Sequence, residues 1–284
     1  MSAAAATLRR LGTRRLVLLL IVVAGLWAAV ELRLRPGGLV PDAGGLRLTG
    51  RFLSAALTPA LTYESPFVPE GTAPLPVKVG AAMATTVAFA AAATSLALVI
   101  GGVLAFLASQ GWWSDRTGGR RVVAPAVYAL TRTVIALSRS VHELLWAVLF
   151  LAAMGLTPLA AVIAIAIPYS GVFAKVFSEM LDEAPRDTAA ALRDAGASPL
   201  RAFVFGLVPR ALPDMTSYAF YRFECALRSA AVLGFFGIPT LGLYVQLSFA
   251  NAHYHEVWTY LCAMFLLVAA VDWWSGRVRR GMLA

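Results

Sequence analysis

The chain has 284 residues, of which 60% are hydrophobic and only 14% charged, whereas soluble domains average about 25% charged residues. A chain this apolar cannot bury its surface in a single soluble core. Its apolar runs are continuous rather than alternating, which favours membrane-spanning helices over a membrane β-barrel. The net charge of +9 does not indicate nucleic-acid binding, because the arginines flank the apolar runs instead of lining one face.

Six apolar runs follow one another, and each predicts a span, since a bilayer core takes roughly 20 helical residues. They cover residues 16–30, 79–108, 141–154, 159–177, 215–236 and 257–274. The first run follows Arg9, Arg10, Arg14 and Arg15, a pattern that signal peptides share. We expect an uncleaved anchor, because residues 27–31 make a poor cleavage site.

The sequence predicts an all-α, polytopic transmembrane bundle with three regions. Residues 1–35 form a basic segment and anchor helix, residues 36–76 an extracytoplasmic loop with a short amphipathic helix near 46–61, and residues 77–284 the core. Basic residues gather in the N-terminus, in 109–121, in 178–214 and in the tail 277–280, whereas 155–158 and 237–256 contain none. The positive-inside rule therefore places both termini in the cytoplasm.

The loop at 178–214 begins with the pattern of a short helix that a glycine ends. Asp187 is placed to cap a helix over residues 188–195 by accepting hydrogen bonds from its first free amides. Gly196 follows, where helices commonly end in a left-handed residue. This part of the loop is therefore expected to form a short helix that ends at Gly196.

A second short helix is predicted directly after the first. Ser198 supplies its N-cap and Pro199 its first position. The helix extends to Val208 and presents one apolar side, made of Leu200, Phe203, Val204 and Leu207. Pro209 and Pro213 are expected to stop it. The helix-turn-helix suits docking into a groove of a soluble partner or lying on the lipid interface, and the local pattern does not decide between them.

Residues 190–198, with the prolines after them, resemble the cytoplasmic coupling loop of ABC importer permeases. That family's motif has Glu-Ala-Ala, three residues and Gly, with a later Leu-Pro. The resemblance assigns the ATPase-coupling role to Asp187, Ala190, Ala191, Leu192, Asp194, Gly196, Ala197, Ser198 and Pro209. Ala190 stands where the family usually has Glu, which implies the loss of one polar contact at the ATPase interface.

A second group of residues indicates one branch within this family. Residues 221–224 and 228–234 resemble the fifth-span signature of phosphonate permeases, and residues 139–147 and 175–179 are similar to that family as well. His142 replaces a usual proline, and residues 237–242 replace a glycine-richer segment. The resemblance covers roughly residues 77–278, and the departures imply a divergent branch.

The resemblance implies a type I importer permease in a bacterial inner membrane, which moves phosphonate or a related small oxyanion. A second copy or a paralogue would complete the path, and a periplasmic substrate-binding protein would deliver the substrate. ABC ATPase subunits on separate chains would act through residues 182–200 by alternating access. The sequence has no phosphate-binding glycine loop and no Ser/His/Asp set, so the chain is predicted not to be an enzyme and to need no cofactor.

Charged residues in the fifth predicted span are candidates for the translocation path, because charges inside a bilayer usually face protein or water. Glu224 and Arg228 are four residues apart and can pair on one face. Arg222 or Arg228 could offer a planar donor fork to an oxyanion, and a structural ion pair near the cytoplasmic interface is the alternative. Among the polar residues 132–143, Arg139 is the best candidate for the path, although this stripe also fits an interface or a second subunit.

The sequence alone leaves other functions open. An ATP-independent secondary carrier would show internal repeats, which the chain lacks, and an ABC permease for an unrelated small solute is a further alternative. His253 and His255 have no third ligand nearby, so they predict no metal site and are expected where a binding protein docks.

Overall fold

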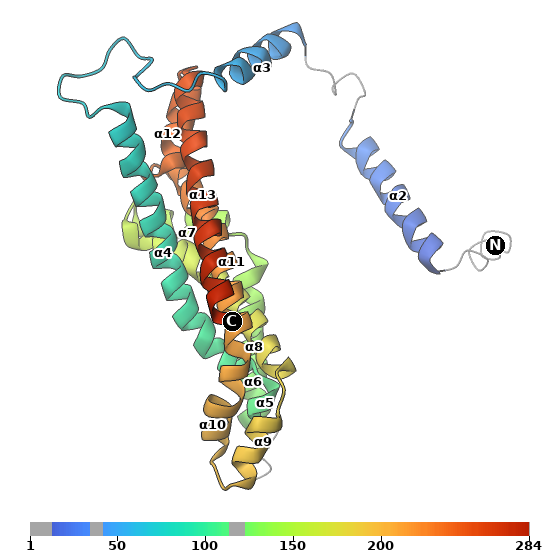
Figure 1. Ribbon diagram of the computed structural model, residues 1–284. Helices are drawn as coiled ribbons and strands as arrows, with labels where there is room; N and C mark the ends of the chain where they lie inside the picture. The colour runs from blue at the N-terminus through green and yellow to red at the C-terminus, as the bar shows by residue number, and fades with distance from the viewer. Residues whose placement is uncertain (1–12, 35–41, 114–122, 284) are drawn as a thin grey trace, which may run out of the picture. The chain divides into compact units, whose positions relative to one another are not determined.

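The computed structural model describes residues 13–34, 42–113 and 123–283, and the chain divides into two compact units, residues 1–54 and 55–284. Every element within the described residues is a helix (Figure 1). The predicted all-α class is therefore confirmed.

The first unit contains α2 (Thr13–Glu31) and most of α3 (Ala43–Ala55). Between its charged ends α2 is apolar on every side and mostly exposed, Leu18, Ile21 and Trp27 among its exposed side chains, as expected of a helix whose surroundings are lipid. Asp42 begins α3 by accepting a hydrogen bond of 2.7 Å from the Gly45 amide. The predicted amphipathic helix thus forms, three residues earlier than expected and ending at Ala55.

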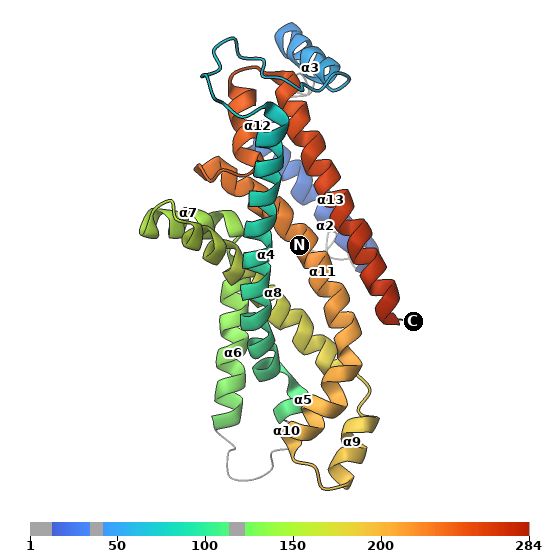
Figure 2. The same cartoon turned by 60° about the vertical axis from the view of Figure 1, so that its left-hand side comes forward.

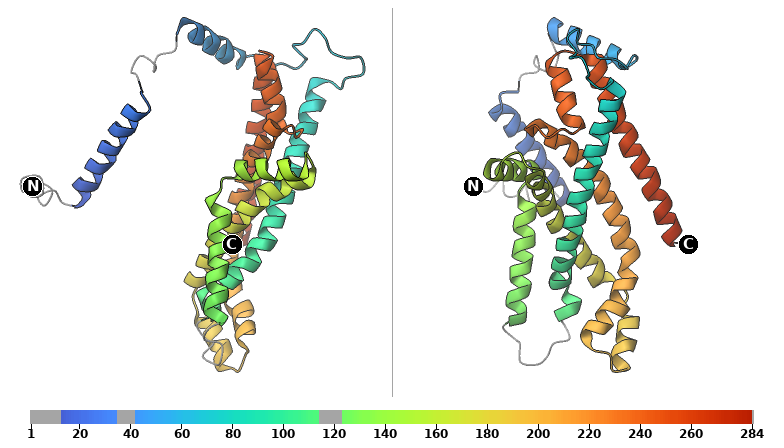
Figure 3. Two further views of the ribbon diagram at one scale, coloured as in Figure 1. Left: turned by 180° about the vertical axis from the view of Figure 1, so that it is seen from behind. Right: turned by 90° about the vertical axis from the view of Figure 1, so that its left-hand side faces the viewer.

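The second unit holds the other helices and the apolar core. In chain order they are α4 (Leu75–Ala108), α5 (Gln110–Trp113), α6 (Val123–Ser140), α7 (Glu143–Met154), α8 (Pro158–Glu183), α9 (Asp187–Asp194), α10 (Pro199–Ala202), a π-helical turn (Phe203–Leu207), α11 (Val208–Val232), a 3-10 turn (Leu233–Phe236), α12 (Leu241–Ala250) and α13 (Tyr254–Leu283). Helices α9 and α10 lie at one end of this unit, and α12 lies at the opposite end with the start of α13 (Figures 2 and 3).

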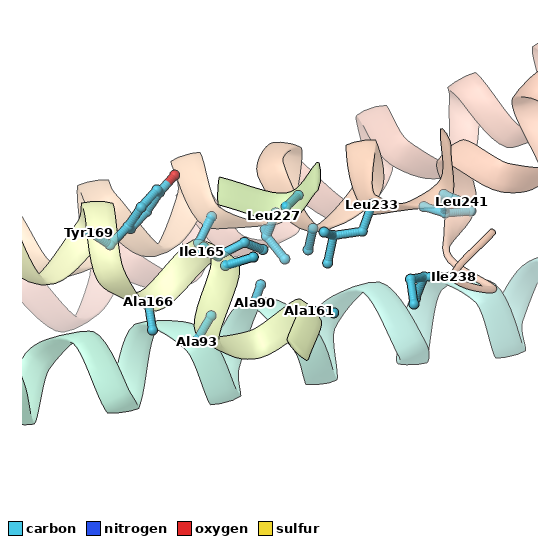
Figure 4. Packing of buried hydrophobic residues seen from close by; sticks show 14 of the residues in the cluster. Ala90, Ala93, Ala161, Ile165, Ala166, Tyr169, Leu227, Leu233, Ile238 and Leu241 are labelled. Carbon is cyan, nitrogen blue, oxygen red and sulfur yellow. The ribbon is translucent and has the colours of Figure 1, made fainter. Parts of the chain in front are cut away.

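Small residues build the centre of the second unit, where α4 crosses α8. Ala90 and Ala93 of α4 and Ala161 of α8 have no exposed surface, and Figure 4 shows them beside Ile165 and Leu227. At Gly101 a Cβ atom would lie only 2.7 Å from Cβ of Phe173. Small side chains let membrane helices approach closely and gain van der Waals contact, so this crossing fixes the positions of the surrounding helices.

The number of spans differs from the prediction. Within the described residues three helices, α4, α8 and α13, are long and apolar enough to cross a membrane, or five if each of two bent helix pairs counts as one span. The sequence predicted six spans. The first predicted run forms α2, which is not among the helices counted here. The helix α7 has 12 residues and is about 18 Å long, too short for a bilayer core. It meets α6 at 90° and lies across it (Figure 2).

The second bend lies between α11 and α12, where the sequence predicted only a loop. The chain turns at Gly237, whose φ of 94° is left-handed, and α12 leaves α11 at 48°. One local and one long-range contact hold the turn: Thr240 donates to the Ala231 carbonyl at 3.0 Å, and the Leu241 amide donates to Thr86 of α4 at 3.1 Å. Tertiary contacts, rather than local pattern, therefore create α12.

The close approach of α11 and α12 leads to a stability prediction. A Cβ at Gly242 would collide with the Ala231 carbonyl oxygen, and one at Gly234 with the backbone of Leu243. We expect Gly242→Val to destabilise the fold by about 1–3 kcal/mol, as overpacking does, and to lower the melting temperature of the detergent-purified protein. Gly102→Val is the control, since no atom lies within 4 Å of a Cβ there. Equal melting temperatures for both variants would refute this packing.

Candidate functional site

The glycine of the loop at 178–214 has the geometry that the sequence predicted. Gly196 has a φ of 86°, its amide donates to the Arg193 carbonyl at 2.8 Å, and the Ala197 amide donates to the Leu192 carbonyl at 2.9 Å. These two bonds form a Schellman motif, which satisfies the last carbonyls of α9. The prediction for Asp187 is wrong: it is the first residue of α9, the N-cap is Arg186, and no side chain caps the helix.

The second helix of the loop begins as predicted but does not stop. Ser198 accepts a hydrogen bond of 3.4 Å from the Arg201 amide, and Pro199 opens α10. The chain then passes through the π-helical turn into α11 without a break, so the expected stops at Pro209 and Pro213 are wrong. Pro209 falls in the first turn of α11, directly after the π-helical turn, and does not end the helix. Pro213 lies inside the helix and removes one backbone bond without ending it.

The apolar side chains of this loop separate into a buried and an exposed set. Phe203 and Leu207 are buried, and the Phe203 ring packs edge-on against Phe106 of α4 at 5.2 Å. Leu200 and Val204, predicted to share that side, are 50% and 41% exposed, and Phe205 is 69% exposed. The exposed trio Leu200, Val204 and Phe205, which we call the tip patch, is an apolar surface at the end of the second unit.

Helix α9 packs directly against the π-helical turn. A Cβ at Gly206 would lie 2.7 Å from Cα of Ala189, so only glycine permits this contact. Arg210 adds a hydrogen bond of 3.0 Å to the Thr188 hydroxyl. Because α8 leads into α9 and the π-helical turn leads into α11, this contact connects the ends of two long helices.

One face of α11 is polar along most of its length. Its members recur every three or four residues, as one helical face requires: Asp214, Ser217, Tyr218, Tyr221, Arg222, Cys225, Arg228 and Ser229. Its first part lines a cavity of about 660 Å³, together with Glu183 of α8 and Arg279 of α13. Polar groups are expensive in lipid, so such a face points to water or to a protein partner.

Farther along α11 the predicted path residues meet residues of α7 and α8. The Arg222 guanidinium lies 4.2 Å from the centroid of the Tyr169 ring. The Tyr169 hydroxyl lies 3.1 Å from that of Ser229, which donates to Glu143 at 3.0 Å. Arg222, Tyr169, Ser229 and Glu143 form what we call the polar cluster.

The structure places the other predicted path residues next to this cluster. Glu224 and Arg228 pair at 3.5 Å, as their spacing predicted, and Arg228 also donates to the Cys225 sulfur at 3.3 Å. Arg139 is exposed in the last turn of α6, and both it and Arg222 lie within electrostatic reach of Tyr218. The sequence did not single out Tyr169 or Ser229 as path residues, because an uncharged hydroxyl in an apolar run gives little signal. The one indication was that Tyr169 stands alone in a run of Ala and Ile.

Comparison with known proteins agrees with this geometry. Residues 101–283 match the family model described as binding-protein-dependent transport system inner membrane component, which is well over half of the chain. The chain belongs to this family. It is thus a multi-pass inner-membrane component of a transport system.

Two curated relatives and one solved structure resemble this transport component. It is 29% identical over 208 residues to the phosphate-import permease protein PhnE of Mycolicibacterium smegmatis, an alignment that covers 73% of this chain but only 37% of the relative. It is 29% identical over 195 residues to the phosphite transport system permease protein PtxC of Stutzerimonas stutzeri, covering 69% and 68%. A structure of the inward-facing MetNI methionine ABC transporter matches with a TM-score of 0.62 at 20% identity, over 74% of this chain and 98% of that one. The structural likeness establishes the fold.

The opposite end of the transport component is held by two reciprocal carboxylates. Glu256 accepts from the Glu64 amide at 2.7 Å, and Glu64 accepts from the Glu256 amide at 3.2 Å. Ser248 of α12 donates to the second oxygen of Glu256 at 3.0 Å. Residues 58–64, which we call the strap, are thereby bound to the turn that starts α13.

The two histidines of this region belong to the same contacts. Nδ1 of His255 lies 2.7 Å from the Thr58 carbonyl oxygen, and Nδ1 of His253 lies 3.9 Å from Glu256. Within the described residues no three His, Cys, Asp or Glu side chains are grouped to hold a metal ion. Here His255 contacts the strap directly and His253 lies beside Glu256, roles that the sequence did not indicate.

Proposed function

We propose that the chain is the membrane-spanning permease subunit of an ABC importer for phosphonate or a related small oxyanion such as phosphite. The polar face of α11 carries this proposal, because it leads from the cavity near Glu183 to the polar cluster. A helix that borders only lipid would not carry such a face. The substrate class is supported by the fifth-span resemblance and by relatives named for phosphate and phosphite import.

The path is proposed to offer several weak contacts instead of one tight site. Arg139, Arg222 and Arg228 would meet the oxyanion in turn as charge-assisted donors. Glu224 already pairs with Arg228 at 3.5 Å, so an anion must share that guanidinium with a carboxylate and leaves it readily. Weak contacts suit a transporter, because each bound state must also release its ligand.

Four partners follow from this proposal. The ABC ATPase subunits would dock on the tip patch, and the loop around Gly196 would couple their motion to α8 and α11. A second permease copy or a paralogue would cover the α11 face, where Tyr221 is 53% exposed. A periplasmic substrate-binding protein would dock at the end that holds the strap, near His253 and His255. Lipid would surround the spans, with both termini in the cytoplasm.

Reconstitution tests the proposal directly. The chain is co-expressed with the ATPase and binding protein encoded beside it, purified and placed in proteoliposomes, and uptake of labelled phosphite and of a phosphonate is measured. We expect uptake that requires both ATP and the binding protein. Uptake without either would show a secondary carrier, and ATP-driven uptake of an unrelated solute alone would refute the oxyanion assignment.

A further inference from the structure

The break between α6 and α7 places a carboxylate inside the polar cluster. Ser140 ends α6, and after the 90° bend Glu143 is the first residue of α7. His142 caps α7 by accepting a hydrogen bond of 3.3 Å from the Leu144 amide. A straight helix would have carried Glu143 past α8 and α11; the bend brings it to Ser229, 86 residues away in the sequence.

The contacts of Glu143 are those that an oxyanion would make. Its Oε1 accepts the Ser229 hydroxyl at 3.0 Å, and that hydroxyl lies 3.1 Å from the hydroxyl of Tyr169, whose ring lies under the Arg222 guanidinium at 4.2 Å. A carboxylate and a phosphonate both present negative oxygens to hydroxyl and guanidinium donors. Glu143 therefore occupies a donor that a transported anion would use.

The Glu143 carboxylate is not held from all sides, and the cluster is not sealed. Its second oxygen, Oε2, lies 3.6 Å from Nε2 of His142, and Nε of Arg222 is buried without a hydrogen-bond partner. The side chains of Glu143 and His142 are 29% and 64% exposed. One carboxylate oxygen thus contacts Ser229 while the other faces an exposed histidine, toward which the side chain can move.

We propose that Glu143 is a resident anion of the translocation path, which occupies the Ser229 donor until the transported oxyanion displaces it toward His142. This inference rests on the proposed function and adds a residue that sets how strongly the path holds its substrate. A site that must first expel its own carboxylate binds more weakly, since apparent affinity falls with the fraction of molecules in the competent state. Glu143 in this role favours release of the transported anion over its retention in the path.

The test measures anion affinity apart from transport. Inorganic phosphite is titrated by calorimetry into the purified permease–ATPase complex without binding protein, for wild type, Glu143→Gln and Glu70→Gln. Glutamine keeps the shape and an acceptor for Ser229 but removes the competing charge. We expect Glu143→Gln to lower the apparent Kd about tenfold or more, and the added change Ser229→Ala to restore weak binding. Glu70→Gln, which removes an exposed carboxylate from the loop before α4, is expected to leave the Kd unchanged.

The outcomes separate this inference from the proposed function. If wild type takes up phosphite with ATP in proteoliposomes but Glu143→Gln gains no affinity, or gains it equally with Ser229→Ala present, the resident-anion role is refuted and the permease function stands. If wild type takes up no oxyanion, the proposed function fails instead. Should Glu143→Gln not yield a monodisperse complex, Glu143→Ala, which removes the carboxylate altogether, must show the same gain.

Discussion

Gly196→Pro is expected to abolish the retention of the ATPase subunits by the detergent-solubilised permease. Gly196 has a φ of 86°, whereas proline is fixed near −65°. The substitution also removes the amide that donates to Arg193 at 2.8 Å. Because proline costs about 3 kcal/mol or more where it breaks a helical bond, the turn between α9 and α10 would open and displace the tip patch.

Co-purification measures this effect, with the tagged permease co-expressed with its ATPase. Gly196→Asn is the matched control, since asparagine tolerates the left-handed region and keeps the amide; it is expected to retain the ATPase. Melting temperatures of both variants separate loss of the interface from loss of the fold. Wild-type stoichiometry in Gly196→Pro would show that the loop is not the coupling element.

The second large effect concerns the opposite end, where Glu256→Ala is expected to release the strap. Glu256 is only 6% exposed and accepts from the Glu64 amide and the Ser248 hydroxyl. Alanine leaves both donors without their acceptor; Ser248 is buried, and an unsatisfied buried donor costs about 1–3 kcal/mol. The remaining strap contacts, such as the Ala60 amide to the His255 carbonyl at 3.2 Å, would not compensate for this loss.

Amide hydrogen exchange of residues 58–64 is the readout, because it reports local opening rather than global unfolding. Glu70→Ala, which removes an exposed carboxylate from the same loop, is the control and should exchange as wild type does. We expect the Glu64 amide to lose most of its protection in Glu256→Ala. Unchanged protection there would mean that the reciprocal carboxylates do not hold the strap.

The sequence by itself determined the class of the protein and the shape of one loop. Long apolar runs exclude a soluble fold because no single core could bury them, and that conclusion needs no knowledge of how the runs pack. The turn at Gly196 and the cap at Ser198 were also predictable, since each depends on the conformation of a few neighbouring residues. Local rules were weaker for the prolines: Pro209 and Pro213 looked like stops, but the π-helical turn before them lets the chain continue as α11.

Only the tertiary structure decided where the helices bend and which polar groups meet. The helix α12 and the turn before it depend on Thr86, 155 residues from its partner Leu241, and the strap depends on Glu64 and Glu256, which are 192 residues apart. Hydropathy along the chain records how apolar each run is, but not the contacts that break it. The polar cluster exists because α7, α8 and α11 converge, and that convergence is a property of helix packing rather than of any local pattern.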